Sequence, residues 1–389
     1  MNRLPRALAR AASFVRPFTT PVAAPVLVLL AAALPADAQV QVQDVVVTTG
    51  ASVDSYEGNL ASVTTPVVDS TQSANARSGQ IGVRGTLLLY SNPERVVTGA
   101  FDFGLRQFAA EGFSTRDFTP RELTGRIDLS AWQRLGSFGS VGAEAGWRSR
   151  RVDDRPPMPL FLQPGYGELI GALLWESPVI DGNLRIGLRL DADEAEYRAP
   201  DQIGALDLLD RNSIGLEARA DWGAQSLFSV YAEGRRVHYP RQSSFDPDDP
   251  FRRDQTFTAG ATWRYRGDFI LELGVEGVLN RSNSSRPEYD AVALNVQYAT
   301  PLPWWELNAN LIGTFTGKSY VEETEFARLV PGEEADNASV LFLDIGRPVE
   351  SNLDATLRLG WTRAETDIGD SFYERFGVSL LFNYRPFAN

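Results

Sequence analysis

The chain has 389 residues, a formal net charge of −13 and no cysteine. The acidic balance argues against nucleic acid as a partner, because phosphate binding needs a basic surface. The lack of cysteine excludes disulfides, thiolate metal sites and a lipid-modified cysteine anchor. No Gly-rich phosphate loop, zinc motif or dinucleotide fingerprint occurs, so the sequence predicts neither a cofactor nor a metal site.

The N-terminus is typical of a cleaved secretory signal. Arginines precede an apolar stretch at residues 22–34, which ends at the small-residue site Ala36-Asp37-Ala38. We predict a signal peptide over residues 1–38 and a mature chain over residues 39–389. Removing Arg3, Arg6, Arg10, Arg16 and Asp37 takes away a net +3, so the charge falls from −13 to −16. A retained membrane anchor is the alternative, but the stretch falls short of the about 20 residues that a spanning helix needs.

Apolar and polar residues alternate over long segments from residue 79 onward. Phe101, Phe103 and Leu105 are separated by Asp102 and Gly104, and the pattern recurs at residues 123–131, 184–193, 214–222 and 271–280. A period of two indicates strands with one apolar and one polar face. Segments of about 10 residues match tilted strands that cross a membrane. A soluble β-sandwich, the alternative, uses strands of about 5–6 residues.

The connections between these segments are sorted by length. Tight ones fall at residues 92–94, 135–138, 178–182, 223–225, 266–268, 300–303 and 348–352. Long ones fall at residues 109–120, 150–165, 194–211, 237–254, 281–288, 318–337 and 363–371. Barrels of bacterial outer membranes have short periplasmic turns and longer external loops. The alternation between short and long connections therefore favours a membrane barrel over a soluble one.

Strand parity completes the predicted fold. About fifteen strands follow residue 79, and closed bacterial barrels have an even number. Residues 44–56 supply the missing first strand, and the last strand lies near residues 372–387. After the signal, no apolar run of about 20 residues offers a spanning helix. The prediction is an all-β fold, a transmembrane antiparallel up-and-down β-barrel of about 16 strands, with 14 to 18 allowed and both ends periplasmic.

Aromatic residues lie near the predicted strand ends, where membrane barrels carry girdles of such rings. They are Tyr90, Trp132, Trp147, Trp175, Trp222, Trp263, Tyr265, Trp304, Trp305 and Trp361. Ordinary enrichment of aromatic residues in strands is the alternative explanation for any one of them.

The end of the chain carries a family motif. Arg375, Gly377, Leu380 and Phe382 follow the spacing polar, any, glycine, two of any, hydrophobic, any, aromatic. This resembles the assembly signal of bacterial outer-membrane β-barrels, although Phe387 is followed by two further residues instead of ending the chain. Size and strand number resemble porin-like barrels across the mature length, without identifying one family.

The resemblance implies a location and partners. We expect the chain in the cell outer membrane of a Gram-negative bacterium, in contact with outer-membrane lipid and lipopolysaccharide. We also expect folding by the barrel assembly machinery, with periplasmic chaperones during transit. A homo-oligomer is left open.

The polar strand faces predict what the barrel encloses. Lumen charges are expected at Arg84, Arg106, Arg126, Arg148, Arg185, Arg189, Arg219, Arg235, Arg264 and Arg358, and at Asp102, Asp128, Glu144, Asp191, Glu217, Asp221, Glu233, Glu272, Glu276 and Glu306. Such charges are tolerable in a water-filled or ion-paired interior, and about sixteen strands leave room for an aqueous channel. The predicted function is a passive porin-like channel for small hydrophilic solutes. Cross-strand ion pairs that merely stiffen the wall are the alternative role of these charges.

The acidic long loops leave a metal question open. The run at residues 246–250 and the carboxylates between residues 322 and 336 could bind Ca²⁺ or Mg²⁺ through oxygen ligands. Their spacing matches no calcium loop, so solvated external loops are the favoured interpretation.

Two other function classes remain as alternatives. An outer-membrane hydrolase would use the single histidine, His238, as a base, with Ser243 or Ser244 nearby. No nucleophile–base motif surrounds them, so no catalytic residue is predicted. An occluded barrel that exports or assembles a surface polymer with a partner is the main alternative, although the barrel begins too near the signal to leave room for a periplasmic domain.

Overall fold

The computed structural model describes residues 40–58, 72–111, 119–153, 165–198, 209–244, 247–284, 288–303, 306–321, 338–365 and 372–387. The predicted signal peptide and the acidic residues 322–336 lie outside these ranges. The described strands are β1 (Gln41–Gly58), β2 (Gln72–Ser91), β3 (Arg95–Glu111), β4 (Arg121–Arg134), β5 (Ser140–Asp153), β6 (Gly165–Glu176), β7 (Leu184–Arg198), β8 (Arg211–Gly223), β9 (Ser226–Ser243), β10 (Phe251–Arg266), β11 (Ile270–Ser282), β12 (Tyr289–Pro301), β13 (Asn308–Tyr320), β14 (Ser339–Glu350), β15 (Leu353–Glu365) and β16 (Phe372–Tyr384).

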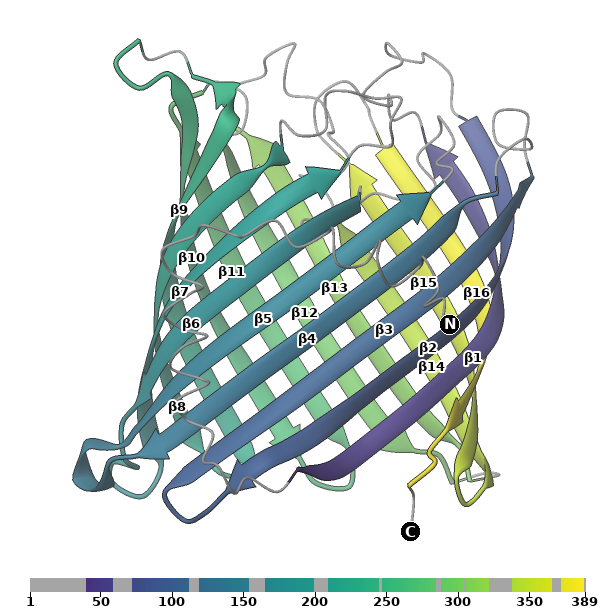
Figure 1. Cartoon of the computed structure of the whole chain (residues 1–389), viewed down its shortest axis with the longest axis horizontal. Helices are drawn as coiled ribbons and strands as arrows, with labels where there is room; N and C mark the ends of the chain where they lie inside the picture. The colour runs from purple at the N-terminus through teal and green to yellow at the C-terminus, as the bar shows by residue number, and fades with distance from the viewer. Residues whose placement is uncertain are drawn as a thin grey trace, which may run out of the picture.

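Each strand pairs antiparallel with its neighbours in sequence, and β1 pairs with β16 to close the barrel. Figure 1 shows the tilted strands of this closed sheet, with the start of β1 and the end of β16 at the same rim. The sixteen-strand antiparallel barrel confirms the predicted fold class. β16 ends at Tyr384, before the predicted residue 387, because Pro386 has no N–H to continue the ladder.

The tight connections meet at one rim of the barrel, where they lie at the bottom of Figure 1. Gly223 shows why one of them needs glycine: its φ is +106°, and a Cβ would lie 2.0 Å from the Ser226 carbonyl oxygen. We call this edge the turn rim and the opposite edge the loop rim.

One hairpin is longer than the sequence predicted. The long connection expected at residues 237–254 is mostly strand, because β9 continues to Ser243 and β10 begins at Phe251. Arg252 explains the extension: its buried guanidinium donates to Asp254 and Gln242 and lies 4.0 Å from the Tyr239 ring centroid. These contacts hold the two strands together beyond the bulge between Phe251 and Arg252.

Contacts between strands that are not neighbours identify the inner face of the sheet. Arg189 on β7 reaches Glu144 on β5 across β6, and Tyr231 on β9 donates to Glu276 on β11 across β10. Side chains converge on the concave side of a curved sheet and diverge on the convex side, so these residues point inward. Because neighbouring residues alternate between faces, the strand registers then assign every described strand position to the inner or the outer face.

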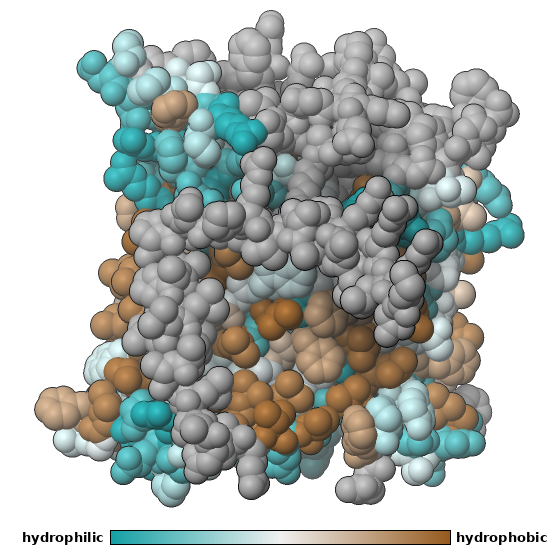
Figure 2. Space-filling view, viewed as in Figure 1, coloured by the Kyte–Doolittle hydropathy of each residue, from teal (hydrophilic) through white to brown (hydrophobic). Residues whose placement is uncertain are grey.

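The outer face is apolar and exposed. Leu216, Phe257, Val292, Leu294 and Phe376 lie on it and are 51% to 57% exposed. Figure 2 shows hydrophobic side chains gathered around the middle of the barrel, with hydrophilic ones toward the rims. A water-soluble barrel would have a polar outer surface, so the apolar outer face found here is the reverse arrangement.

Aromatic rings form an outer run near the turn rim on β8 to β12. Trp222 and Phe228 stack with ring centroids 5.8 Å apart, and Phe228 lies 6.4 Å from Trp263. Tyr265, Phe269 and Tyr298 extend the run across β10 to β12. Trp132 departs from the expected girdle, because it lies on the inner-face parity of Arg126 and Asp128, against Gly142. Trp304 and Trp305 lie outside the described residues.

The buried apolar residues gather inside the mouth at the loop rim. Tyr56, Phe108, Val152 and Tyr373 come from β1, β3, β5 and β16 and belong to one cluster of buried side chains. The Tyr56 and Tyr373 rings are 6.4 Å apart, across the β1–β16 seam.

No helix among the described residues is long and apolar enough to cross a membrane.

Candidate functional site: the inner wall of the barrel

The strand registers bring the predicted lumen charges onto one wall. Arg84, Asp102, Arg126 and Arg148 are direct cross-strand partners along β2 to β5, and Arg185–Asp221 and Arg264–Glu272 pair in the same way. The inner-face set also contains Arg106, Arg189, Arg219, Arg235, Arg358, Asp128, Glu144, Asp191, Glu217, Glu233, Glu272 and Glu276. Glu306 does not belong to it, because it lies in the turn between β12 and β13. That these charges set selectivity stays a prediction.

Arg235 is the centre of the densest ion-pair network. Its guanidinium lies 2.5 Å from Asp191, 2.9 Å from Asp193 and 2.7 Å from Glu233. The two aspartate side chains are 8% and 11% exposed, so the network is largely withdrawn from solvent. Ser213 accepts a further hydrogen bond from Arg235 at 2.6 Å. This region of the wall, on β7 to β9, is held together by charge pairing.

Other pairs connect neighbouring strands or positions two apart on one strand. Arg358 binds Asp344 through two hydrogen bonds of 2.7 Å, and Arg264 pairs with Glu272. Arg126 lies 2.5 Å from Asp128, but the two side chains are 54% and 32% exposed. The structure thus supports the ion-paired wall that the sequence left as an alternative, while leaving charges accessible from the lumen.

Some of the predicted lumen charges make no ion pair with any described residue. Arg84, Asp102 and Arg185 are exposed, and none of them makes an ion pair with another described residue. The Nε of Arg106 is buried and has no hydrogen-bond partner. The Arg148 Nε on the same wall is buried and without a partner in the same way, although the Arg148 Nη1 donates to Glu168.

A cluster of Ser52, Asp54, Arg375 and Gly377 at the β1–β16 seam was not predicted from the sequence. Asp54 is 1% exposed and accepts hydrogen bonds from Arg375 at 2.9 Å and from Ser52 at 3.0 Å. Gly377 makes room for it, since a Cβ there would lie 2.3 Å from the Asp54 Oδ1. The signal available in sequence was an aspartate on the inner parity of the first strand. Its partner lies 321 residues away, beyond the reach of a local pattern.

The assembly-signal residues have distinct positions. Leu380 and Phe382 lie on the outer face of β16 and are 48% and 39% exposed, and Phe387 follows the strand and is 64% exposed. Gly377 faces inward at the seam. Recognition of these residues by an assembly machinery stays a prediction.

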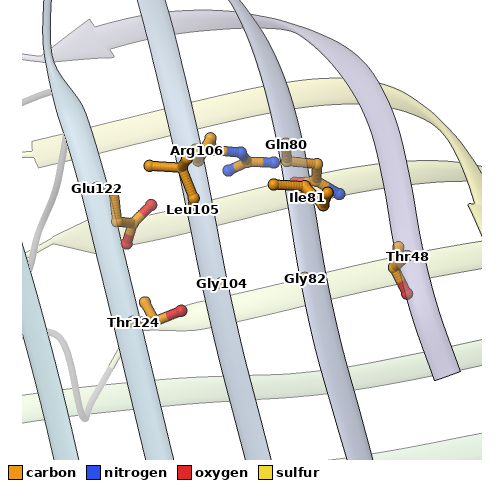
Figure 3. A pocket seen from close by; sticks show the side chains of 9 residues that line it. All are labelled: Thr48, Gln80, Ile81, Gly82, Gly104, Leu105, Arg106, Glu122 and Thr124. Carbon is orange, nitrogen blue, oxygen red and sulfur yellow. The ribbon is translucent and has the colours of Figure 1, made fainter. Parts of the chain in front are cut away.

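A recess opens in the inner wall on β1 to β4 (Figure 3). Its volume is about 240 Å³, and its inner-face lining is Thr48, Gln80, Gly82, Gly104, Arg106, Glu122 and Thr124. Figure 3 shows Arg106 reaching from β3 toward Gln80 on β2, while Glu122 and Thr124 extend from β4. Ile81 and Leu105 complete the lining between these positions.

His238 lies apart from the inner wall. It occupies an outer-face position on β9, and its ring packs edge-on against Phe251 at 5.9 Å. Its Nδ1 is buried and makes no hydrogen bond to another described residue. The described residues contain no group of three or more His, Cys, Asp or Glu side chains that could hold a metal ion.

Comparison with known proteins gives similarity of fold alone. No protein-family model matches the chain, and no curated protein matches it. Salmonella typhi OmpF, solved with daunomycin, is 10% identical with a TM-score of 0.43, over 88% of this chain and 98% of that one. A BenF-like porin from Pseudomonas fluorescens Pf-5 is 9% identical with a TM-score of 0.40, over 90% and 99%. A bacterial polysaccharide outer membrane secretin is 10% identical with a TM-score of 0.37, over 87% and 98%.

Proposed function

We propose that this protein is a passive outer-membrane channel for small hydrophilic solutes. One observation carries the proposal: a closed barrel of sixteen strands is apolar outside and carries exposed charges inside. Charges of both signs are stable in such an interior when water or an ion partner reaches them. A barrel of this strand number is wide enough for an aqueous path.

The outer surface supports the membrane part of the proposal. The exposed apolar band would be unstable in water, but it matches the hydrocarbon layer of a bilayer. The aromatic run at the turn rim suits the headgroup level, where rings with polar tips are favoured. We assign the turn rim to the periplasm, because periplasmic turns are the short ones in this class of barrel.

Single-channel recording of the refolded chain in a planar bilayer tests the function. We expect steady openings in the wild type. Asp128→Asn should shift ion selectivity toward anions and Arg126→Gln toward cations, because each leaves its 2.5 Å partner uncompensated in the lumen. Asp268→Asn, in a turn outside the lumen, is the matched control and should leave the selectivity unchanged.

A folded barrel that stays silent would overturn the proposal. Folding is checked independently by the shift in gel mobility on heating. The silent outcome would favour an occluded barrel that needs a partner chain, such as one that exports a surface polymer.

A further inference from the structure

The recess on the inner wall has a regular construction. Thr48, Gly82, Gly104 and Thr124 are direct register partners across β1, β2, β3 and β4. The two paired glycines remove side chains from the middle of this row, while a threonine borders it at each end. A side chain at Gly104 would take up the space next to Thr124, because its Cβ would already lie 2.6 Å from the Thr124 hydroxyl.

Charged rows flank the recess on both sides along the barrel. Gln80, Arg106 and Glu122 are register partners toward the loop rim. Arg84, Asp102 and Arg126 are register partners toward the turn rim. A solute in the recess would therefore meet hydroxyls at its sides. Along the pore it would meet one or two guanidinium groups and one carboxylate in each flanking row.

The balance of available charge favours an anion. Glu122 is already engaged, because Arg150 donates to it at 2.7 Å and both side chains are only 15% exposed. Two arginines next to the recess, Arg84 and Arg106, make no ion pair with another described residue, against one such carboxylate, Asp102. A carboxylate is the usual partner for a guanidinium group, and the excess of one unpaired positive charge next to the recess favours it.

The hydroxyl and amide groups narrow the ligand class. Thr124 and Gln80 can donate to and accept from solute hydroxyls, and Thr48, whose O–H donates to Asn383, can accept from them. The volume of about 240 Å³ lies below the range of about 300–1,000 Å³ typical of sites for drug-sized ligands. The recess therefore suits a solute of a few carbons that carries both a carboxylate and hydroxyl groups.

We propose that this recess is a binding subsite for small hydroxycarboxylates. The proposal rests on the channel function as the route by which such solutes arrive. The carboxylate would lie beside Arg106 and Arg84, with hydroxyls toward Thr48 and Thr124.

The test is current block by gluconate, with glucose as the neutral comparator of similar size. Wild-type channels should be blocked by gluconate at concentrations at least tenfold lower than by glucose. Arg106→Gln should raise the half-blocking gluconate concentration at least tenfold, since it removes a charge-assisted hydrogen bond. Gly104→Leu should do the same by filling the recess.

Two controls separate the recess from general effects on the pore. Arg134→Gln removes the same charge from an inner-face position of β4 at the turn rim. Gly187→Leu adds the same side chain to the inner wall on β7, where a Cβ would meet the Trp175 carbonyl oxygen at an ordinary 3.7 Å. Both should keep the wild-type response to gluconate. Equal loss in variants and controls, or equal block by gluconate and glucose, would overturn the subsite.

Calorimetric titration of the detergent-solubilised barrel with gluconate distinguishes this proposal from the channel function. A silent barrel that binds gluconate, and loses this binding in Arg106→Gln and Gly104→Leu, would retain the subsite and reject the channel. A conducting barrel that binds no gluconate would retain the channel and reject the subsite.

Discussion

Gly377 lies at the β1–β16 seam, where its lack of a side chain leaves room for the Asp54 carboxylate. Replacing it with alanine places a Cβ 2.3 Å from the Oδ1 of Asp54, a buried carboxylate that Arg375 and Ser52 hold in position. Overpacking of this kind costs about 1–3 kcal/mol. We expect Gly377→Ala to lower the free energy of unfolding by that amount in guanidinium titrations in lipid vesicles. Gly277→Ala, where a Cβ meets nothing within 4 Å, is the control. Equal stability of the two variants would refute this packing role.

Two arginines on the same wall should differ greatly in importance. Arg235→Met would leave Asp191 and Asp193, 8% and 11% exposed, without their main cation. Breaking a buried pair costs about 3–5 kcal/mol because a charge stays buried and uncompensated. Arg126→Met removes a pair that is 54% and 32% exposed, and such pairs contribute below about 1 kcal/mol. Denaturant midpoints of the two variants give the comparison, and similar losses would argue that lumen water screens both sites equally.

At the scale of strands, the face on which a residue lies could be predicted from the sequence, because it depends only on the local alternation of residues. Period two assigns Arg126, Asp128 and Ser130 to one face of β4 without knowledge of any neighbour. The same parity places Trp132 on the inner face. The prediction that it belongs to the aromatic girdle was wrong, because it followed from residue type and not from the position of Trp132 in the strand. The Arg189–Glu144 pair and the Gly82–Gly104 recess were not predicted, because both depend on the stagger between strands, which a single-strand pattern does not contain.

The β1–β16 seam offers a direct test of strand stagger. Thr48 and Asn383 are register partners, and their side chains form a hydrogen bond of 2.8 Å. Cysteines at both positions should form a disulfide, since opposed strand residues lie within about 4.5–5.5 Å between Cα atoms. The chain has no native cysteine, so the result is unambiguous. Thr48→Cys with Ser379→Cys, four residues out of register, should stay reduced. Cross-linking of the second pair in place of the first would show a shifted seam.

At the scale of the whole molecule, charge is distributed unevenly around the inner wall. Inner ion pairs lie on β4 to β11 and again on β14, β15, β16 and β1. The inner positions of β12 and of the half of β13 nearest the turn rim instead carry mainly alanine, amide and hydroxyl side chains such as Ala293, Asn295 and Thr314. Asn295 and Thr314 bond to each other at 2.7 Å instead of to a charge. A solute crossing the barrel would therefore meet ion pairs over most of the wall and a neutral polar strip along β12 and the adjoining half of β13.

The orientation of the barrel follows from the same sorting of its connections. With the turn rim in the periplasm, a cysteine at Val179, 49% exposed in the turn before β7, should be shielded in intact cells. A cysteine at Asp248, exposed in the connection between β9 and β10, should face the medium. We expect a maleimide attached to a polymer too large for the pore to label Asp248→Cys on intact cells. Val179→Cys should react only after the outer membrane is permeabilised. The reverse pattern would invert the barrel, and protection of both sites until lysis would place the chain away from the cell surface.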